Sequence, residues 1–265
     1  MMSKWLVRSM LAAACSAVLC WGCGARAAES AAAPAADGNA YAALANLPDW
    51  SGAWEPMFMR RPPGAAPPAP PKLTPEYAAQ YARYLETNRK SPGLNFVSDV
   101  ANCVPPGLPI SMQWPYPIEF LFTPGRVTIL IESEHLVRRI YTDGRALPKE
   151  PDATYQGTSV GHWEGDTLVV ETEAILPSTS PLEGIEGHSA DLRITERLRL
   201  LQPDLLEIKT TRADPAVFLE PYTSTFYYQR HRDWQIMEYV CEQNNHDAVD
   251  AQGKPEFNLG SQPQH

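Results

Sequence analysis

The chain has 265 residues, with 22 Lys and Arg against 31 Asp and Glu, and a formal net charge of −9. An acidic surface repels phosphate backbones, so we expect no nucleic-acid partner. Hydrophobic residues make up 44% of the chain, enough for a sizeable core, and this length suits one all-β domain with extensions.

Residues 1–27 have the pattern of an export signal. Two basic residues precede an apolar run over residues 10–21, and Ala25-Arg26-Ala27 fits a small-x-small cleavage site. The run is too short to span a membrane, and no later stretch is long and uncharged enough to do so. We therefore predict a periplasmic or secreted protein without a transmembrane span. Cleavage removes three basic residues and takes the net charge to −12.

The cysteines fall into two groups. Cys15, Cys20 and Cys23 lie in the predicted signal, so a lipid-anchored protein is the competing interpretation. Cys103 and Cys241 remain after cleavage, and two cysteines in an oxidising compartment predict a disulfide. The chain-entropy model gives this long loop roughly 4–5 kcal/mol of stabilisation. Two buried free thiols are the alternative.

The N-terminal part of the exported chain contains few strand signals. Residues 28–46 are Ala-rich without a period, so we predict a disordered segment. Gly52-x-Trp54 opens the first expected strand and resembles the lipocalin signature, in which Trp closes one end of a barrel. Residues 62–71 form a polyproline-type spacer. A helix is predicted over residues 75–90, with its tyrosines on one face packed against the sheet.

Residues 94–117 contain five prolines, which exclude a central strand and favour an ordered apolar loop covering an open end of a barrel. From Ile118 onward, strands alternate with polar turns, and residues 234–241 form the last expected strand. About ten strands result. We predict an antiparallel up-and-down, lipocalin-like barrel over residues 47–245, with a loose tail at residues 246–265. A β-sandwich is the alternative closure.

Two motifs are weighed and set aside. Gly157-Thr-Ser-Val-Gly161 matches G-x-S-x-G, but a nucleophile requires a strand, a sharp turn and a helix, and here a strand follows. The six histidines show no metal-binding spacing, and Glu132, Glu134 and His135 form only a weak cluster. We expect no metal and no cofactor.

Strand periodicity places two carboxylates in apolar rows. Glu196 shares a face with Ile194 and Leu198, and Glu238 shares one with Trp234. A buried carboxylate is costly unless it is paired or protonated, so Arg139 or His188 is the expected partner. Such carboxylates can act as acid or base. A structural ion pair, or rows that face water, is the alternative.

Several stretches together resemble an uncharacterised family of exported bacterial proteins. They include Pro115–Glu119, Ile140–Arg145, Thr195–Arg197, Glu238–Glu242 and, as the longest run, Ser159–Glu171. The resemblance implies export and a β fold, and it implies no catalytic residues.

We therefore predict an exported barrel that binds an apolar or aromatic small molecule in its interior. The expected ligand-binding residues are Phe120, Phe122, Arg139, Tyr141, Trp163, Phe226, Tyr228 and Trp234. One alternative is a cofactor-free lyase, isomerase or hydrolase, with Glu196 or Glu238 as acid or base and His188 or Arg139 stabilising developing charge. A second alternative is an envelope protein-interaction module.

Overall fold

The structure is a computed structural model that describes residues 40–57, 60–90, 103–241, 248–249 and 255–256. All of these belong to one compact unit, which spans Ala36–His265. The predicted signal peptide lies outside the described residues. Within them, no helix is long and apolar enough to cross a membrane.

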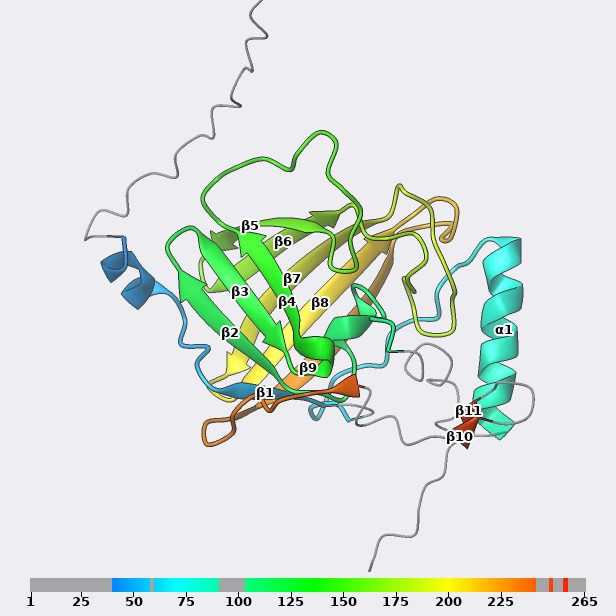
Figure 1. Ribbon diagram of the computed structural model, residues 1–265, viewed down its shortest axis with the longest axis horizontal. Helices are drawn as coiled ribbons and strands as arrows, with labels where there is room; N and C mark the ends of the chain where they lie inside the picture. Colours follow the sequence, from blue (N-terminus) through cyan, green and yellow to red (C-terminus); the bar gives the residue numbers. More distant parts are fainter. Residues whose placement is uncertain (1–39, 58–59, 91–102, 242–247, 250–254, 257–265) are drawn as a thin grey trace, which may run out of the picture. The chain divides into compact units, whose positions relative to one another are not determined.

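Nine strands form a closed barrel, and each is hydrogen-bonded to its neighbours in chain order (Figure 1). β1 pairs with β9 and closes the ring. This confirms the predicted all-β barrel. The strands are β1 (Ala53–Pro56), β2 (Ile118–Thr123), β3 (Arg126–Ile131), β4 (Leu136–Tyr141), β5 (Thr158–Glu164), β6 (Thr167–Glu173), β7 (Arg193–Gln202), β8 (Leu205–Ala213) and β9 (Tyr222–His231).

The barrel departs from the predicted up-and-down order at one place. β4 and β5 are parallel, with Ile140 opposite Ser159 and Tyr141 opposite Val160. Two adjacent parallel strands need a connection that returns the chain to the starting end of the sheet. Residues 142–157 supply that connection and contain no helix or strand. The other eight pairings of the ring are antiparallel.

The predicted last strand, residues 234–241, is wrong, because this segment has no strand structure. β1 and β9 already pair with each other, so they leave no free edge for a tenth strand. The segment instead lies against the β3–β4 connection, where η4 (Ser133–His135) forms a short 3-10 helix. Met237 N donates to Glu132 Oε2 at 2.9 Å, and Tyr239 N donates to His135 Nε2 at 2.9 Å.

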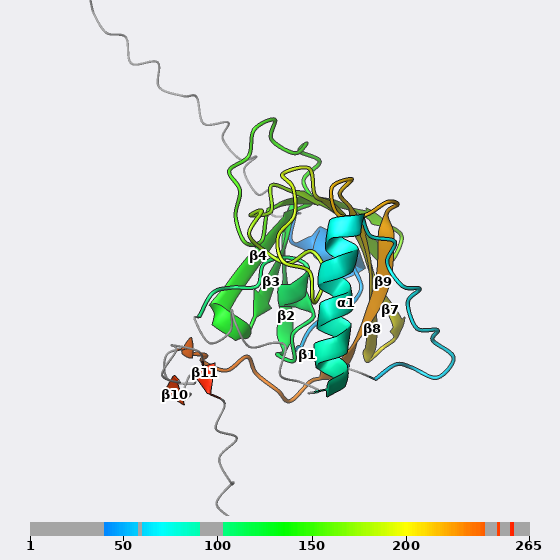
Figure 2. The ribbon, with the colours of Figure 1, turned by 90° about the vertical axis from the view of Figure 1, so that its right-hand side faces the viewer.

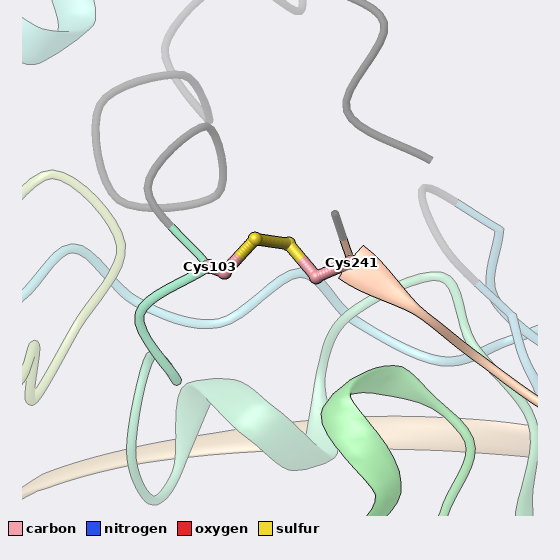
Figure 3. The surroundings of a disulfide bond; sticks show 2 residues. All are labelled: Cys103 and Cys241. Carbon is pink, nitrogen blue, oxygen red and sulfur yellow. A yellow bond between two sulfur atoms is a disulfide. The ribbon is translucent and has the colours of Figure 1, made fainter. Parts of the chain in front are cut away.

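A disulfide joins Cys103 to Cys241, as predicted, with an S–S distance of 2.09 Å (Figure 3). The bridge joins the end of the segment that follows β9 to the chain just before η3 (Ile110–Met112). η3 is a short 3-10 helix whose three residues are buried. Next to the bridge, Tyr239 packs edge-on against Tyr116, with ring centroids 5.3 Å apart. The C-terminal segment is therefore held by backbone hydrogen bonds, an aromatic contact and a covalent link.

α1 (Pro75–Lys90) matches the predicted helix (Figure 2). Two of its tyrosines, Tyr77 and Tyr81, pack against a small separate core of Leu73, Ile185, Val217 and Phe218. Leu182 and Tyr222, the first residue of β9, pack against the same core, so the helix meets the barrel at the start of this strand. The predicted spacer at residues 62–71 contains no helix or strand.

The predicted loose ends are partly structured where they are described. Residues 42–46, the end of the segment expected to be disordered, form a 3-10 helix, η1 (Ala42–Asn46). In the predicted tail, β10 (Ala248–Val249) pairs with β11 (Pro255–Glu256). Ala40 and Tyr41 form a turn before η1, while residues 28–39, 246–247, 250–254 and 257–265 lie outside the described residues.

One end of the barrel is closed by aromatic side chains that surround the Gly52-x-Trp54 signature. Trp54 is fully buried and donates its indole N–H to the Trp50 carbonyl at 3.0 Å. The Arg230 guanidinium lies over its ring at 4.5 Å. Gly52 has φ +91°, and a Cβ there would come within 3.1 Å of the His231 carbonyl oxygen. Trp54 is therefore packed at this end of the barrel beside a close approach of two backbone segments.

Candidate functional site

Glu196 lies in the barrel interior with no exposed surface, as strand periodicity predicted. Its partner is Arg138, rather than Arg139 or His188. Both Nη atoms of Arg138 donate to the carboxylate, Nη1 to Oε1 at 3.2 Å and Nη2 to Oε2. Arg138 Nη2 also donates to Thr172 Oγ1 at 3.2 Å, and the Thr172 and Ser159 hydroxyls are 2.8 Å apart. The result is a polar network within an apolar core, in which Arg138 Nε is the donor without a partner among the described residues.

Arg139 and Tyr141 were placed on the wrong face of β4. The inward row is Leu136, Arg138 and Ile140, while Arg139 is exposed. Tyr141 is half-buried beneath the Arg145 guanidinium at 4.0 Å. The error has a clear origin, because β4 carries two adjacent arginines and hydrophobic residues on both faces. Its sequence therefore does not define which row faces inward.

The other predicted interior groups lie elsewhere. Glu238 is exposed in the C-terminal segment, and Trp234 is 42% exposed and stacks on His231 at 3.7 Å. His188 is buried in the loop between β6 and β7, where Nδ1 donates to the Ser189 carbonyl at 2.7 Å and Nε2 lies 3.2 Å from Thr179 Oγ1. Glu196 pairs with Arg138, His188 contacts Ser189 and Thr179, and Glu238 is exposed, so no hydrogen bond among the described residues joins either carboxylate to His188.

A second cation lies in the interior and was missed by the sequence analysis. Arg212 faces inward from β8, in one row with Leu206, Ile208 and Thr210, and has no exposed surface. Burial lowers its pKa to about 10, so the guanidinium remains charged at neutral pH. Its Nη1 donates to Ser224 Oγ at 2.8 Å. The same period-two rule that placed Glu196 inside would have found it.

An apolar hollow of about 340 Å³ lies beside the β2–β3 turn, between η1 and the barrel. Phe122 and Trp163, both predicted as ligand-binding, line it, with ring centroids 5.7 Å apart. Arg126 is the charged residue of its lining, and the Arg126 Nε is buried without a hydrogen-bond partner among the described residues. The other lining residues are Ala40, Ala43, Leu44, Leu47, Thr123, Pro124, Gly125, Val127 and Thr142.

The remaining predicted lining residues fill the interior rather than the hollow. Phe120 and Tyr228 are buried in the main core, and Phe226 packs against it, 5.8 Å from the Tyr228 ring. Burial raises the pKa of the Tyr228 hydroxyl, which has no hydrogen-bond partner among the described residues. These aromatic residues therefore form core packing at the centre of the barrel.

Ser159, the serine of G-x-S-x-G, lies inside β5 with its backbone paired to β4 and β6. No turn leads from it into a helix, so it lacks the strained elbow that exposes a nucleophilic serine. Across the described ranges, no group of three or more His, Cys, Asp or Glu side chains is placed to hold a metal ion.

The class that the geometry defines is a closed β-barrel with a buried ion pair at its centre and an apolar hollow beside one hairpin turn. Comparison with family models and with curated proteins found no match to the chain. The resemblance to a family of exported bacterial proteins therefore remains a prediction.

Proposed function

We propose that this protein is an extracytoplasmic barrel that binds a small apolar or aromatic molecule in the hollow beside the β2–β3 turn. The observation that carries the proposal is the hollow itself, of about 340 Å³ and lined mainly by apolar side chains. Ligand sites in proteins have volumes of about 300–1,000 Å³ and are mostly apolar with a few placed polar groups.

The proposed position differs from the interior site expected from the sequence. At this end of the barrel, Trp50, Trp54 and Phe120 fill the centre, and each is at most 5% exposed. A ligand would therefore lie outside this plug, against the Phe122 and Trp163 rings. The compartment is supported by the Cys103–Cys241 disulfide, because such bonds persist mainly in oxidising environments.

The polar group of the hollow narrows the ligand class. The unpaired Arg126 N–H supports a ligand that carries an acceptor or a negative charge on an aromatic body. Two probes of similar shape separate the contribution of the aromatic body to binding from that of the negative charge. N-phenyl-1-naphthylamine is neutral, and 8-anilino-1-naphthalenesulfonate carries a sulfonate. An Arg126→Met variant is expected to weaken binding of the sulfonate probe by about 10-fold or more, and of the neutral probe much less.

A fluorescence titration with N-phenyl-1-naphthylamine tests the site. The Ala43→Trp variant places a large ring in the hollow, and Ala45→Trp places the same ring on η1 outside the lining. We expect enhanced, blue-shifted emission with the parent protein and with Ala45→Trp, and at least about 10-fold weaker binding with Ala43→Trp. No emission change with the parent protein, or equal binding by both variants, would contradict the proposal.

The enzyme alternative receives less support. A general base must reach the proton that it abstracts. Glu196 is fully buried, and both of its oxygens accept hydrogen bonds from Arg138. Glu238 is exposed in the segment that follows β9. Neither carboxylate therefore combines a free oxygen with an enclosed site.

A further inference from the structure

We infer that Arg212 is a binding site for the carboxylate group of a ligand inside the barrel. This site is separate from the hollow. Arg212 lies near the end of β8, opposite Tyr222 at the start of β9, whereas the hollow lies beside the β2–β3 turn. Nothing in the inference depends on whether the hollow binds an aromatic molecule.

The first argument concerns charge. Three arginines of the described residues are buried, and two of them have carboxylate partners: Arg138 pairs with Glu196, and Arg230 pairs with Asp49 at 3.0 Å. Arg212 has no carboxylate of the described residues within 4.0 Å. A guanidinium remains protonated, so its burial leaves a charge that a desolvated interior disfavours strongly.

Two acids lie near Arg212, and both are already engaged. Glu196 acts on Arg212 electrostatically, but both of its oxygens accept hydrogen bonds from Arg138. Asp214, two residues along the chain, is buried and accepts hydrogen bonds at both oxygens. Its Oδ2 accepts from Ser189 N at 2.8 Å, and its Oδ1 accepts from Ser189 Oγ and Ala216 N, both at 2.9 Å. Asp214 therefore orders the loop after β8 rather than neutralising Arg212. Tyr222, whose ring is 5.6 Å from the guanidinium, supplies a π-face but no full negative charge.

The second argument concerns hydrogen bonds. The Arg212 Nη1 donates to Ser224 Oγ at 2.8 Å, but Nε and Nη2 are buried without a partner among the described residues. These two nitrogens form one edge of the guanidinium plane. Two parallel N–H groups on that edge match the two oxygens of a carboxylate, which is the geometry of a bidentate pair. A single anionic group would satisfy both the charge and the donors.

The test uses the full exported chain with sodium benzoate and sodium acetate as probes, against sodium chloride at equal ionic strength. Thermal unfolding is measured for the parent protein, Arg212→Met, Arg212→Lys and the control Arg139→Met, which removes an exposed arginine. We expect the carboxylates to raise the Tm of the parent and of Arg139→Met. The apparent affinity should fall by about 10- to 100-fold in Arg212→Met and in Arg212→Lys, since lysine lacks the planar edge.

A readout on the folded parent protein keeps the test decisive if a variant fails to fold. The ¹⁵N-edited spectrum of arginine Nε–H groups should show one resonance that shifts on saturation with benzoate, and Ala43→Trp should show the same shift. A spectrum that does not respond, or equal responses in Arg212→Met and Arg139→Met, would overturn the inference. A response lost in Ala43→Trp would assign the carboxylate to the hollow and also overturn it.

Discussion

Replacement of the Arg138–Glu196 pair gives the sharpest test of what holds the barrel interior together. Both side chains are 1% exposed, so removal of either one leaves an uncompensated buried charge. Loss of one partner of such a pair costs about 3–5 kcal/mol, whereas replacement of both by apolar residues of similar volume is often neutral or stabilising. We therefore expect Arg138→Met and Glu196→Gln each to lower the free energy of unfolding by about 3–5 kcal/mol.

The double variant Arg138→Met/Glu196→Leu should be more stable than either single variant. It leaves the Thr172 hydroxyl without its Arg138 donor, which costs about 1 kcal/mol. Unfolding in guanidinium chloride, followed by tryptophan fluorescence under oxidising conditions, measures all three. The exposed Arg197–Glu164 pair on the outer face, at 2.8 Å, is the matched control, and its single variants should leave the midpoint unchanged. A double variant less stable than both singles would refute the reasoning.

Two further predictions concern covalent and ionic links between distant segments. Cys103→Ser should lower the free energy of unfolding by about 5 kcal/mol, because the disulfide to Cys241 closes a loop of 138 residues. Urea unfolding with and without dithiothreitol measures this loss. A parent protein whose stability does not change with reductant would contradict the prediction. Hydrogen bonds from Ser51, then Arg230 and Arg232, hold the pKa of Asp49 well below its usual value of 3.8. Ionised Asp49 therefore stabilises the folded state fully above pH 3.8, and this stabilisation is lost as the pH falls through the lowered pKa. The Tm deficit of Asp49→Asn should be present at pH 7 and shrink below pH 4. A deficit that does not depend on pH would exclude this linkage.

The sequence was most informative where local rules and burial agree. Turn residues at Pro124-Gly125, Gly165-Asp166 and Pro203-Asp204 bound the hairpins, and the alternation around Glu196 placed it inside. Each of these follows from the neighbours of a residue along the chain. Pairing of Cys103 with Cys241 was also predictable, because only two cysteines follow the predicted signal.

The sequence was least informative where partners are far apart in the chain. Residues 234–241 read as a strand, but whether a strand forms depends on a free sheet edge, and β1 occupies the edge of β9. The parallel β4–β5 pair and the choice of Arg138 over Arg139 likewise depend on the closed ring. The hollow could not be predicted, because it arises where η1 meets the β2–β3 turn.

The pairing of the first strand with the last has a consequence for how the molecule is made. Ala53 lies opposite His231, so the ring of strands can close only after nearly the whole domain has been synthesised. Until then the outer edges of β1 and β8 have unpaired backbone groups that can recruit another chain. Contacts of such long range are also slow to form, because the entropy of loop closure is paid before they stabilise the chain. During biogenesis the vulnerable interval therefore ends with the arrival of β9, and a chain that stops before Tyr222 should aggregate.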